Sequence, residues 1–404
     1  MHEAIESARR AEPDEAVVER ARVAVAVAFA LSGLSFSSWL SRLPSVRDAL
    51  DLSPSQLGLL LLCLSAGSVA GLPLSGPIVH RLGSQWAVRG GGLCGAVGLV
   101  ALAAGISSGS VPPAALGLLL AGYGLATWDV AMNVEGADVE RRLGRTLMPR
   151  FHAGFSVGTV AGALVGATCA ALRVSVTAQL VATAALVLVA VAVATRSFLP
   201  ARRPEDRAHA SSSGSLRAWR EPRTLLVGLL VLAFGFTEGV ANDWLTVAFV
   251  DGHGTSEATG ALAFAVFVVA MTVSRTVGGS ALERWGRVPV LRGTALLALV
   301  GLLLVTLGPS LPWALVGCLL WGAGAALGFP VGMSAAADEP ERAAARVSVV
   351  ASIGYVSFLA GPPLVGFLGE HVGVLRALLV VAAAVVVGLL AAGAARPPVV
   401  DPAA

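Results

Sequence analysis

Residues 76–84 read Gly-Pro-Ile-Val-His-Arg-Leu-Gly-Ser, and the pattern returns at residues 279–287 as Gly-Ser-Ala-Leu-Glu-Arg-Trp-Gly-Arg. Both copies keep a first glycine, an arginine five residues later and a second glycine two residues beyond it, at an offset of 203 residues. Five further glycines recur at an offset of 200 residues: Gly117, Gly122, Gly124, Gly154 and Gly166. Repeated coincidences at nearly one offset indicate two structural repeats of similar build.

The amino-acid composition excludes a water-soluble protein. The 404 residues are 56% hydrophobic and 13% charged, with a mean hydropathy of +0.79, whereas soluble proteins are about 25% charged. The formal net charge of +3 is small for this length and does not indicate a nucleic-acid partner. The apolar segments are too long and too numerous for soluble cores, so the sequence predicts a chain surrounded mainly by lipid.

A helix needs about 20 predominantly apolar residues to cross the hydrocarbon core of a bilayer. Twelve segments meet this requirement: 22–42, 56–79, 86–106, 112–134, 153–172, 176–198, 224–249, 258–279, 288–308, 312–336, 347–368 and 372–394. They lack the short alternating pattern of barrel strands, and isolated strands cannot satisfy their backbone groups in lipid. The expected fold class is therefore all-α integral membrane, with twelve transmembrane helices.

The arginines predict how the chain is oriented. All 28 basic residues are arginine, and 23 of them fall in the termini and in the loops on the same side as the termini. Positive charge is retained on the cytoplasmic side, so both termini are expected in the cytoplasm. The expected organisation begins with a cytoplasmic N-terminal tail (1–20) and an N-terminal six-helix bundle (21–198). A polar cytoplasmic linker (199–223), a C-terminal six-helix bundle (224–395) and a cytoplasmic C-terminal tail (396–404) follow.

The repeated pattern resembles the loop signature Gly-x-x-x-Asp-Arg-x-Gly-Arg of the major facilitator superfamily. This resemblance implies two pseudo-symmetric six-helix bundles around a central cavity, and secondary transport by alternating access. In the first copy His80 replaces the acidic residue and Ser84 the final basic one. We therefore expect weaker ionic contacts to hold the gate closed at this copy. The residues expected to act in gating are Gly76, Arg81, Gly83, Gly279, Glu283, Arg284, Gly286 and Arg287.

Two further stretches narrow the resemblance. Residues 128–133, Trp-Asp-Val-Ala-Met-Asn, and residues 150–158, Arg-Phe-His-Ala-Gly-Phe-Ser-Val-Gly, resemble the fucose/proton symporter branch and its MosC-like relatives from rhizopine loci. The resemblance implies that Asp129 occupies the position of the proton-coupling carboxylate, which is glutamate in that branch. The branch carries a further carboxylate on its first span, and this sequence has none there. Whether the chain uses the same coupling circuit or the same sugar is therefore left open.

Polar residues inside the predicted spans mark the expected solute site. An ionisable side chain within a span costs roughly 2.5–3.5 kcal/mol on insertion scales, so it is expected to have a function. Asp129 is the first candidate for proton coupling and Glu238 the second, with Asn133 and Asn242 each one helical turn further along the same face. Asp243 points about 140° away from Glu238 and is expected at the outer boundary or in an outer gate.

The first span adds three candidates for the cavity. Ser35, Trp39 and Arg42 follow each other at helical spacing and are expected to line its outer mouth. Aromatic faces stack on sugar rings and amides bond hydroxyl groups, so these residues favour a polyol-like or sugar-like solute. Arg275 is expected to pair with the second loop motif at the cytoplasmic end, and Trp244 to lie at the membrane interface.

Other functions remain open. A proton-antiport exporter of a drug or secondary metabolite would suit the same residues, and a membrane-embedded enzyme or sensor is a remote alternative. The sequence lacks a Walker loop and the HExxH and GxSxG motifs, and its four cysteines fall singly in different spans, so neither an enzyme, a cofactor nor a metal site is expected. We expect a monomer in a bacterial inner membrane, with a small solute, protons and lipid as its partners.

Overall fold

The computed structural model describes residues 15–145, 147–200, 215–339 and 342–397, and within them every regular element is a helix. The first half contains α2 (Glu15–Leu40), α3 (Leu43–Ala49), α4 (Pro54–Ser108), α5 (Val111–Leu143), α6 (Met148–Ala171), α7 (Val176–Ala194) and the short 3-10 helix η1 (Thr195–Ser197). The second contains α8 (Ser215–Ala218), α9 (Pro222–His253), α10 (Glu257–Trp285), α11 (Arg287–Leu307), α12 (Leu311–Ala325), α13 (Gly328–Ala336), α14 (Ala343–Val372), α15 (Val374–Ala377), α16 (Val380–Ala391) and η3 (Ala392–Ala395).

Among the described residues, 11 helices are long and apolar enough to cross a membrane. One of them, α4, has 55 residues, which is about 80 Å of straight helix and far more than a bilayer requires. It bends sharply at Gly83, where the backbone leaves the helical conformation, and so supplies two spans. The expected all-α fold with twelve spans is confirmed, and the expected segments match the helices to within a few residues at most ends.

The bend repeats in the second half. Gly83 has φ 81° and ψ 163°, and Gly286, 203 residues later, has φ 79° and ψ 167° between α10 and α11. A side chain at a positive φ is strained, which is why both copies of the pattern keep glycine there. The repeat seen in the sequence is therefore a repeat of backbone geometry.

Small residues bring the helices of each half into close contact. A methyl carbon built on Gly98 of α4 would lie 2.5 Å from the carbonyl oxygen of Gly117 on α5. The equivalent pair in the second half, Gly301 and Gly317, would give 2.6 Å. Packing of this kind is typical of helices in lipid, where backbone approach replaces the hydrophobic effect as the source of association.

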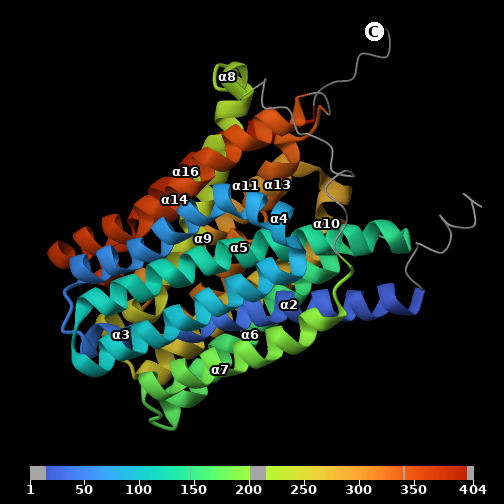
Figure 1. Cartoon of the computed structure of the whole chain (residues 1–404). Helices are drawn as coiled ribbons and strands as arrows, with labels where there is room; N and C mark the ends of the chain where they lie inside the picture. Colours follow the sequence, from blue (N-terminus) through green and yellow to red (C-terminus); the bar gives the residue numbers. More distant parts are fainter. Residues whose placement is uncertain (1–14, 146, 201–214, 340–341, 398–404) are drawn as a thin grey trace, which may run out of the picture.

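The two halves meet along α4 with α14, α6 with α10, and α2 and α3 with α9. In Figure 1 the helices run roughly across the view, with α3 at the left-hand end and the start of α2 at the right-hand end. We call the end that holds α3 the α3 end. We call the opposite end, where α2 begins, the Gly83 end. Large apolar side chains such as Leu390, Val189 and Leu172 are mostly exposed on the outside, as expected for a lipid-facing surface.

Candidate functional site

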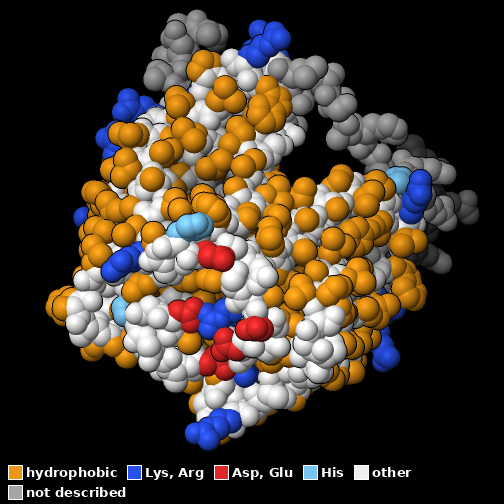
Figure 2. All heavy atoms as spheres, turned by 90° about the vertical axis from the view of Figure 1, so that its left-hand side faces the viewer, with side chains coloured by type: hydrophobic (Ala, Val, Ile, Leu, Met, Phe, Trp, Pro, Cys, Tyr) orange, Lys and Arg blue, Asp and Glu red, His pale blue; other side chains and the backbone are white. Residues whose placement is uncertain are grey.

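A network of charged side chains joins the two halves at the α3 end. Arg42 donates from Nε to Glu257 Oε1 of α10 at 2.9 Å and from Nη1 to Gln179 of α7 at 2.8 Å, and the residue is only 3% exposed. Ser45 also donates to Glu257, and Arg47 pairs with Asp251 of α9. Figure 2 looks onto this end and shows acidic and basic side chains gathered at its centre, with apolar side chains around them.

A second contact lies beside this network. The hydroxyl of Ser53 donates to Glu370 Oε2 at 2.9 Å, and the start of α4 packs on the end of α14. A methyl carbon on Gly58 would lie 2.5 Å from the carbonyl oxygen of Pro362, and one on Gly366 would lie 2.6 Å from that of Pro54. The halves are therefore in backbone contact as well as ion-paired at the α3 end.

The Gly83 end is different. Between described residues, the hydrogen bonds and ion pairs that join the two halves include those of Arg42, Arg47 and Ser53, and these lie at the α3 end. Arg81, Glu283 and Arg284 are exposed, and a methyl carbon on Gly76 or Gly279 would meet nothing within 4 Å. The halves are thus closed at the α3 end, and the loop motifs do not pack against the opposite half.

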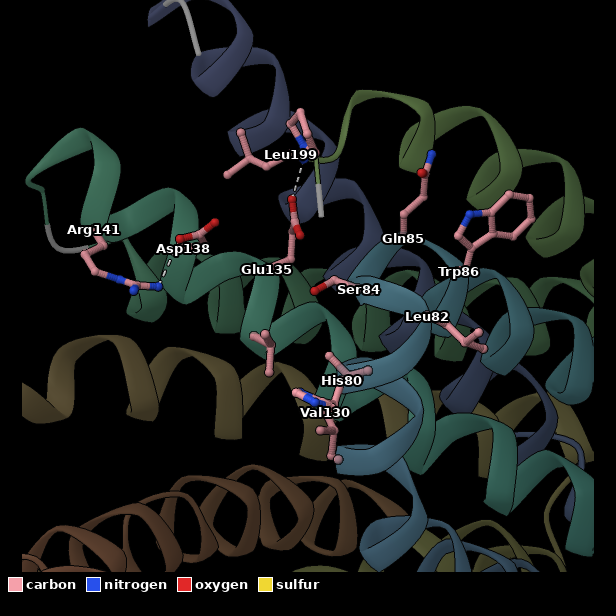
Figure 3. Close-up of a pocket in the computed structure, with 15 residues that line it drawn as sticks. His80, Leu82, Ser84, Gln85, Trp86, Val130, Glu135, Asp138, Arg141 and Leu199 are labelled. Atoms are coloured by element: carbon pink, nitrogen blue, oxygen red, sulfur yellow. Dashed lines mark hydrogen bonds and ion pairs between the residues drawn. The ribbon is translucent and has the colours of Figure 1, made fainter. Parts of the chain in front are cut away.

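The two loop motifs make different contacts within their own halves. In the second, Arg287 pairs with Asp338 at 2.7 Å, and Arg223 holds the other oxygen of the same carboxylate at 2.7 Å. In the first, Ser84 stands where Arg287 does, and its side chain lies beside that of Glu135 (Figure 3). Figure 3 shows Ser84, Glu135 and Leu199 around one pocket, where the Leu199 amide donates to Glu135 at 2.6 Å.

Asp129 is an exposed carboxylate on α5. Its hydrogen bonds come from Asn133 on the next turn, whose amide donates to Asp129 Oδ1 at 3.3 Å and to its carbonyl oxygen at 2.8 Å. In the described part of the chain it has no ion pair. Tyr355 of α14, in the other half, lies close enough to interact electrostatically with it. Asp129 therefore faces the space between the two halves without a cation to balance it.

Glu238, the second candidate, is held by an ion pair. Arg275 of α10 donates from Nη2 to Glu238 Oε2 at 2.7 Å and from Nε to the carbonyl oxygen of Ala326 at 3.1 Å. That carbonyl is available because Pro330, four residues on, has no N–H to donate to it, and the helix breaks here between α12 and α13. The expectation that Arg275 pairs with the second loop motif is wrong.

His152, a residue of the first half, lies near the ion pair of Glu238 and Arg275 in the second half. Its ring lies edge-on to Phe29 with 5.1 Å between centroids, and it is close enough to Arg275 to feel its charge. Neither His152 nor Tyr355 was among the candidates for the solute site, because Arg275 and Asp129, which lie near them, belong to the opposite half. The broken helix did leave a signal, the proline at position 330 inside an apolar span.

The remaining candidates are spread more widely. Ser35 and Trp39 line a small cavity within the first half together with Trp128, and Trp39 is 2% exposed. Arg42 does not line an open outer mouth as expected, because closure at the α3 end buries it. Asn242 is buried and its neighbour Asp243 half-buried, with no partner for Asp243 among the described residues.

The interfacial placement expected for Trp244 is also wrong. Its side chain is 0% exposed, because α9 lies in the middle of the second half, where most of its residues are buried. A tryptophan in such a helix packs against protein on every side and is unavailable to the membrane surface.

Curated relatives and solved structures resemble the whole chain. An uncharacterized transporter, y4wD, of Sinorhizobium fredii is 34% identical over 88% of this chain and 96% of its own length. The membrane protein MosC of Rhizobium meliloti is 26% identical over 89% and 86%. Among crystal structures, the nucleoside transporter NupG gives a TM-score of 0.75 at 14% identity over 94% and 98% of the two chains.

A variant of the E. coli fucose:proton symporter FucP gives a TM-score of 0.63 at 16% identity over 93% of this chain and 98% of its own. At such identities the two structures show the fold alone. The model of the Major Facilitator Superfamily matches residues 25–249 and 234–403, which together span the two repeats. With its twelve apolar spans, its paired glycine bends and these matches, the chain belongs to the Major Facilitator Superfamily.

Proposed function

We propose that the chain is a proton-coupled secondary transporter that moves a small polyol-like or sugar-like solute by alternating access. The observation that carries this proposal is Asp129, a carboxylate within a membrane span that faces the space between the halves without an ion pair in the described residues. A group of this kind is expected to bind a proton or a polar solute, since an isolated charge in a span is otherwise costly.

The contacts of the two acids support Asp129 over Glu238 as the proton carrier. Glu238 would have to give up its ion pair with Arg275 to take up a proton, whereas Asp129 would break no ion pair. The Arg275 contact to the broken helix also gives Glu238 a structural task in the second half. Asn133, Asn242 and Tyr355 would then supply hydrogen bonds to the hydroxyl groups of the solute.

The asymmetry between the two ends supports alternating access. Closure at the α3 end and the unpacked loop motifs correspond to one of two facings. In the other facing, Gly76 and Gly279 would let the helix ends at the Gly83 end approach closely.

The arginine distribution supports an inner-membrane orientation with both termini cytoplasmic, the α3 end periplasmic, and the tail, bundle and linker bounds expected from the sequence. Most of both tails and most of the linker lie outside the described residues. Reporter fusions at residue 210 test this orientation, and a periplasmic signal there would reverse it. We expect the transporter to act as a monomer.

The test of the proposed function is uptake by the purified protein in proteoliposomes with an imposed pH gradient, probed with L-fucose, D-xylose, myo-inositol and uridine. We expect at least one of these solutes to accumulate only with the gradient, and to carry protons that a pH-sensitive dye inside the vesicles reports. Uridine is included because NupG is a nucleoside transporter. Uptake that ignores the gradient would contradict proton coupling, and accumulation of uridine alone would contradict the solute class.

A further inference from the structure

A shallow groove lies between the first turns of α2 and the last turns of α7, away from the interface between the halves. The two helices pack side by side there, as Figure 1 shows for the α2 and α7 ribbons. The groove opens to the outside of the molecule, at the Gly83 end of a helix that is long and apolar enough to span the membrane. No step of the proposed transport cycle uses it.

The groove is built from two matched stripes of side chains. On α2, Arg20, Val23 and Val27 follow each other at helical spacing, and on the α7 side Val193 and Ser197 do the same. In each stripe the polar residue lies at the Gly83 end and the apolar residues lie deeper along the span. Arg20 and Val27 are about 10 Å apart along the helix axis, which is the length of several methylene groups.

The apolar part of the groove is uncovered by protein. Val23, Val27 and Val193 are 54%, 39% and 55% exposed. Their exposure alone would indicate only a lipid-facing surface. The polar end makes this groove different from the rest of that surface.

The polar end of the groove is lined by Glu19, Arg20 and Arg22, so its lining carries one more positive than negative charge. Arg22 is tied to Glu19 at 2.5 Å, but Arg20 beside it has no hydrogen bond or ion pair with any described residue. The acid in the lining is thus taken up by Arg22, and the guanidinium of Arg20 is left over. An unpaired arginine above an apolar floor presents its fork of donors to an anion that carries a hydrocarbon tail.

We propose that this groove binds an anionic phospholipid, with the phosphate on Arg20 and one acyl chain along the valines. The hydroxyl of Ser197 adds a donor for a phosphate or glycerol oxygen. A zwitterionic lipid would present the same phosphate, but its ammonium group would sit beside the unpaired Arg20 and be repelled. The groove therefore selects by headgroup charge, as basic pockets between membrane helices do.

Native mass spectrometry of the detergent-purified full chain tests this inference, with dioleoyl phosphatidylglycerol and dioleoyl phosphatidylcholine as probes of equal chain length. We expect the wild-type protein to retain the phosphatidylglycerol at least fivefold more strongly. Arg20→Gln should reduce this preference about fivefold, because each arginine near a charged lipid surface contributes about one such factor. Equal retention of both lipids by the wild-type protein would overturn the proposal.

Arg292→Gln is the matched control, because Arg292 is an exposed arginine at the Gly83 end of the other half without a partner in the described residues. It removes the same charge and should leave the preference unchanged. An equal loss in Arg292→Gln would show that net charge rather than the groove selects the lipid, and would also overturn the proposal. Displacement of the lipid by inorganic phosphate at equal concentration would assign Arg20 to a free anion and refute the acyl-chain site.

Discussion

Glu257→Gln is expected to open the α3 end. The substitution keeps the size of the side chain but removes the charge that balances Arg42, which is 3% exposed. Removing one partner of a buried ion pair costs about 3–5 kcal/mol. Because the Glu257 side chain is 23% exposed, water offsets part of this cost, and we expect about 2 kcal/mol. The contact exists only in the closed arrangement, so the cost falls on that state alone.

A penalty of about 2 kcal/mol changes the ratio of closed to open molecules by about 30-fold. Pulsed electron spin resonance can measure this ratio as a distance distribution between spin labels on Ala49 and Val372, in a background without the four native cysteines. Both positions lie at the α3 end, one on each half, and both are exposed. We expect the short-distance population to decrease and a longer one to appear.

Arg141→Gln is the matched control, because its ion pair with Asp138 lies within α5 and the arginine is 59% exposed. It should leave the distribution unchanged. Arg42→Gln combined with Glu257→Gln should recover part of the closed population, since neither residue then leaves a buried charge. An unchanged distribution in Glu257→Gln would refute the reasoning that this pair holds the α3 end closed.

Three further results follow from the same geometry. Gly279→Leu should insert and fold normally but block solute uptake, because the space beside Gly279 is open in this facing and would have to close in the other; normal uptake would reduce the loop motif to a boundary marker. The hydrogen bond from Arg346 holds the pKa of Glu221 below its ordinary value of 4.5. The ionised Glu221 therefore stabilises the folded protein above pH 4.5, and this stabilisation is lost as the pH falls through the lower pKa of the folded state. Thermal unfolding at decreasing pH should therefore show a decline below about pH 4.5 that is smaller in Glu221→Gln. Pro330→Ala restores an N–H at the α12–α13 break, so Arg275→Gln should destabilise that variant less than the wild-type protein, and additive changes in melting temperature would contradict the capping role of Arg275.

The spans could be predicted because lipid imposes a length and a composition that a single segment must satisfy by itself. The repeat of Gly83 at Gly286 was visible for a similar reason, since a glycine pattern needs no partner to be recognised, but the bend that it marks was seen only in the structure. Apolar length does not resolve where helices break without a loop, and so the segment 312–336 was expected as one helix although α12 ends at Ala325 and α13 begins at Gly328.

The contacts of the site depend on how the elements pack, and spacing along the chain does not carry that information. Asp129 and Asn133 were found together because one helix turn joins them. Arg275 lies 37 residues from Glu238, and only the packing of α10 on α9 brings them to 2.7 Å. Arg42 was placed at the mouth of a cavity because the sequence does not show that Glu257 of the other half covers it in the closed arrangement.

The central claim, that Asp129 carries the coupled proton, is tested most directly with Asp129→Asn in proteoliposomes that contain the transported solute. Asparagine keeps the shape and the hydrogen bonding of the side chain but cannot take up a proton. We predict that accumulation driven by the pH gradient is lost while exchange of labelled for unlabelled solute continues, and that Glu238→Gln does not give this separation. Accumulation of solute by Asp129→Asn under an imposed pH gradient would contradict the account.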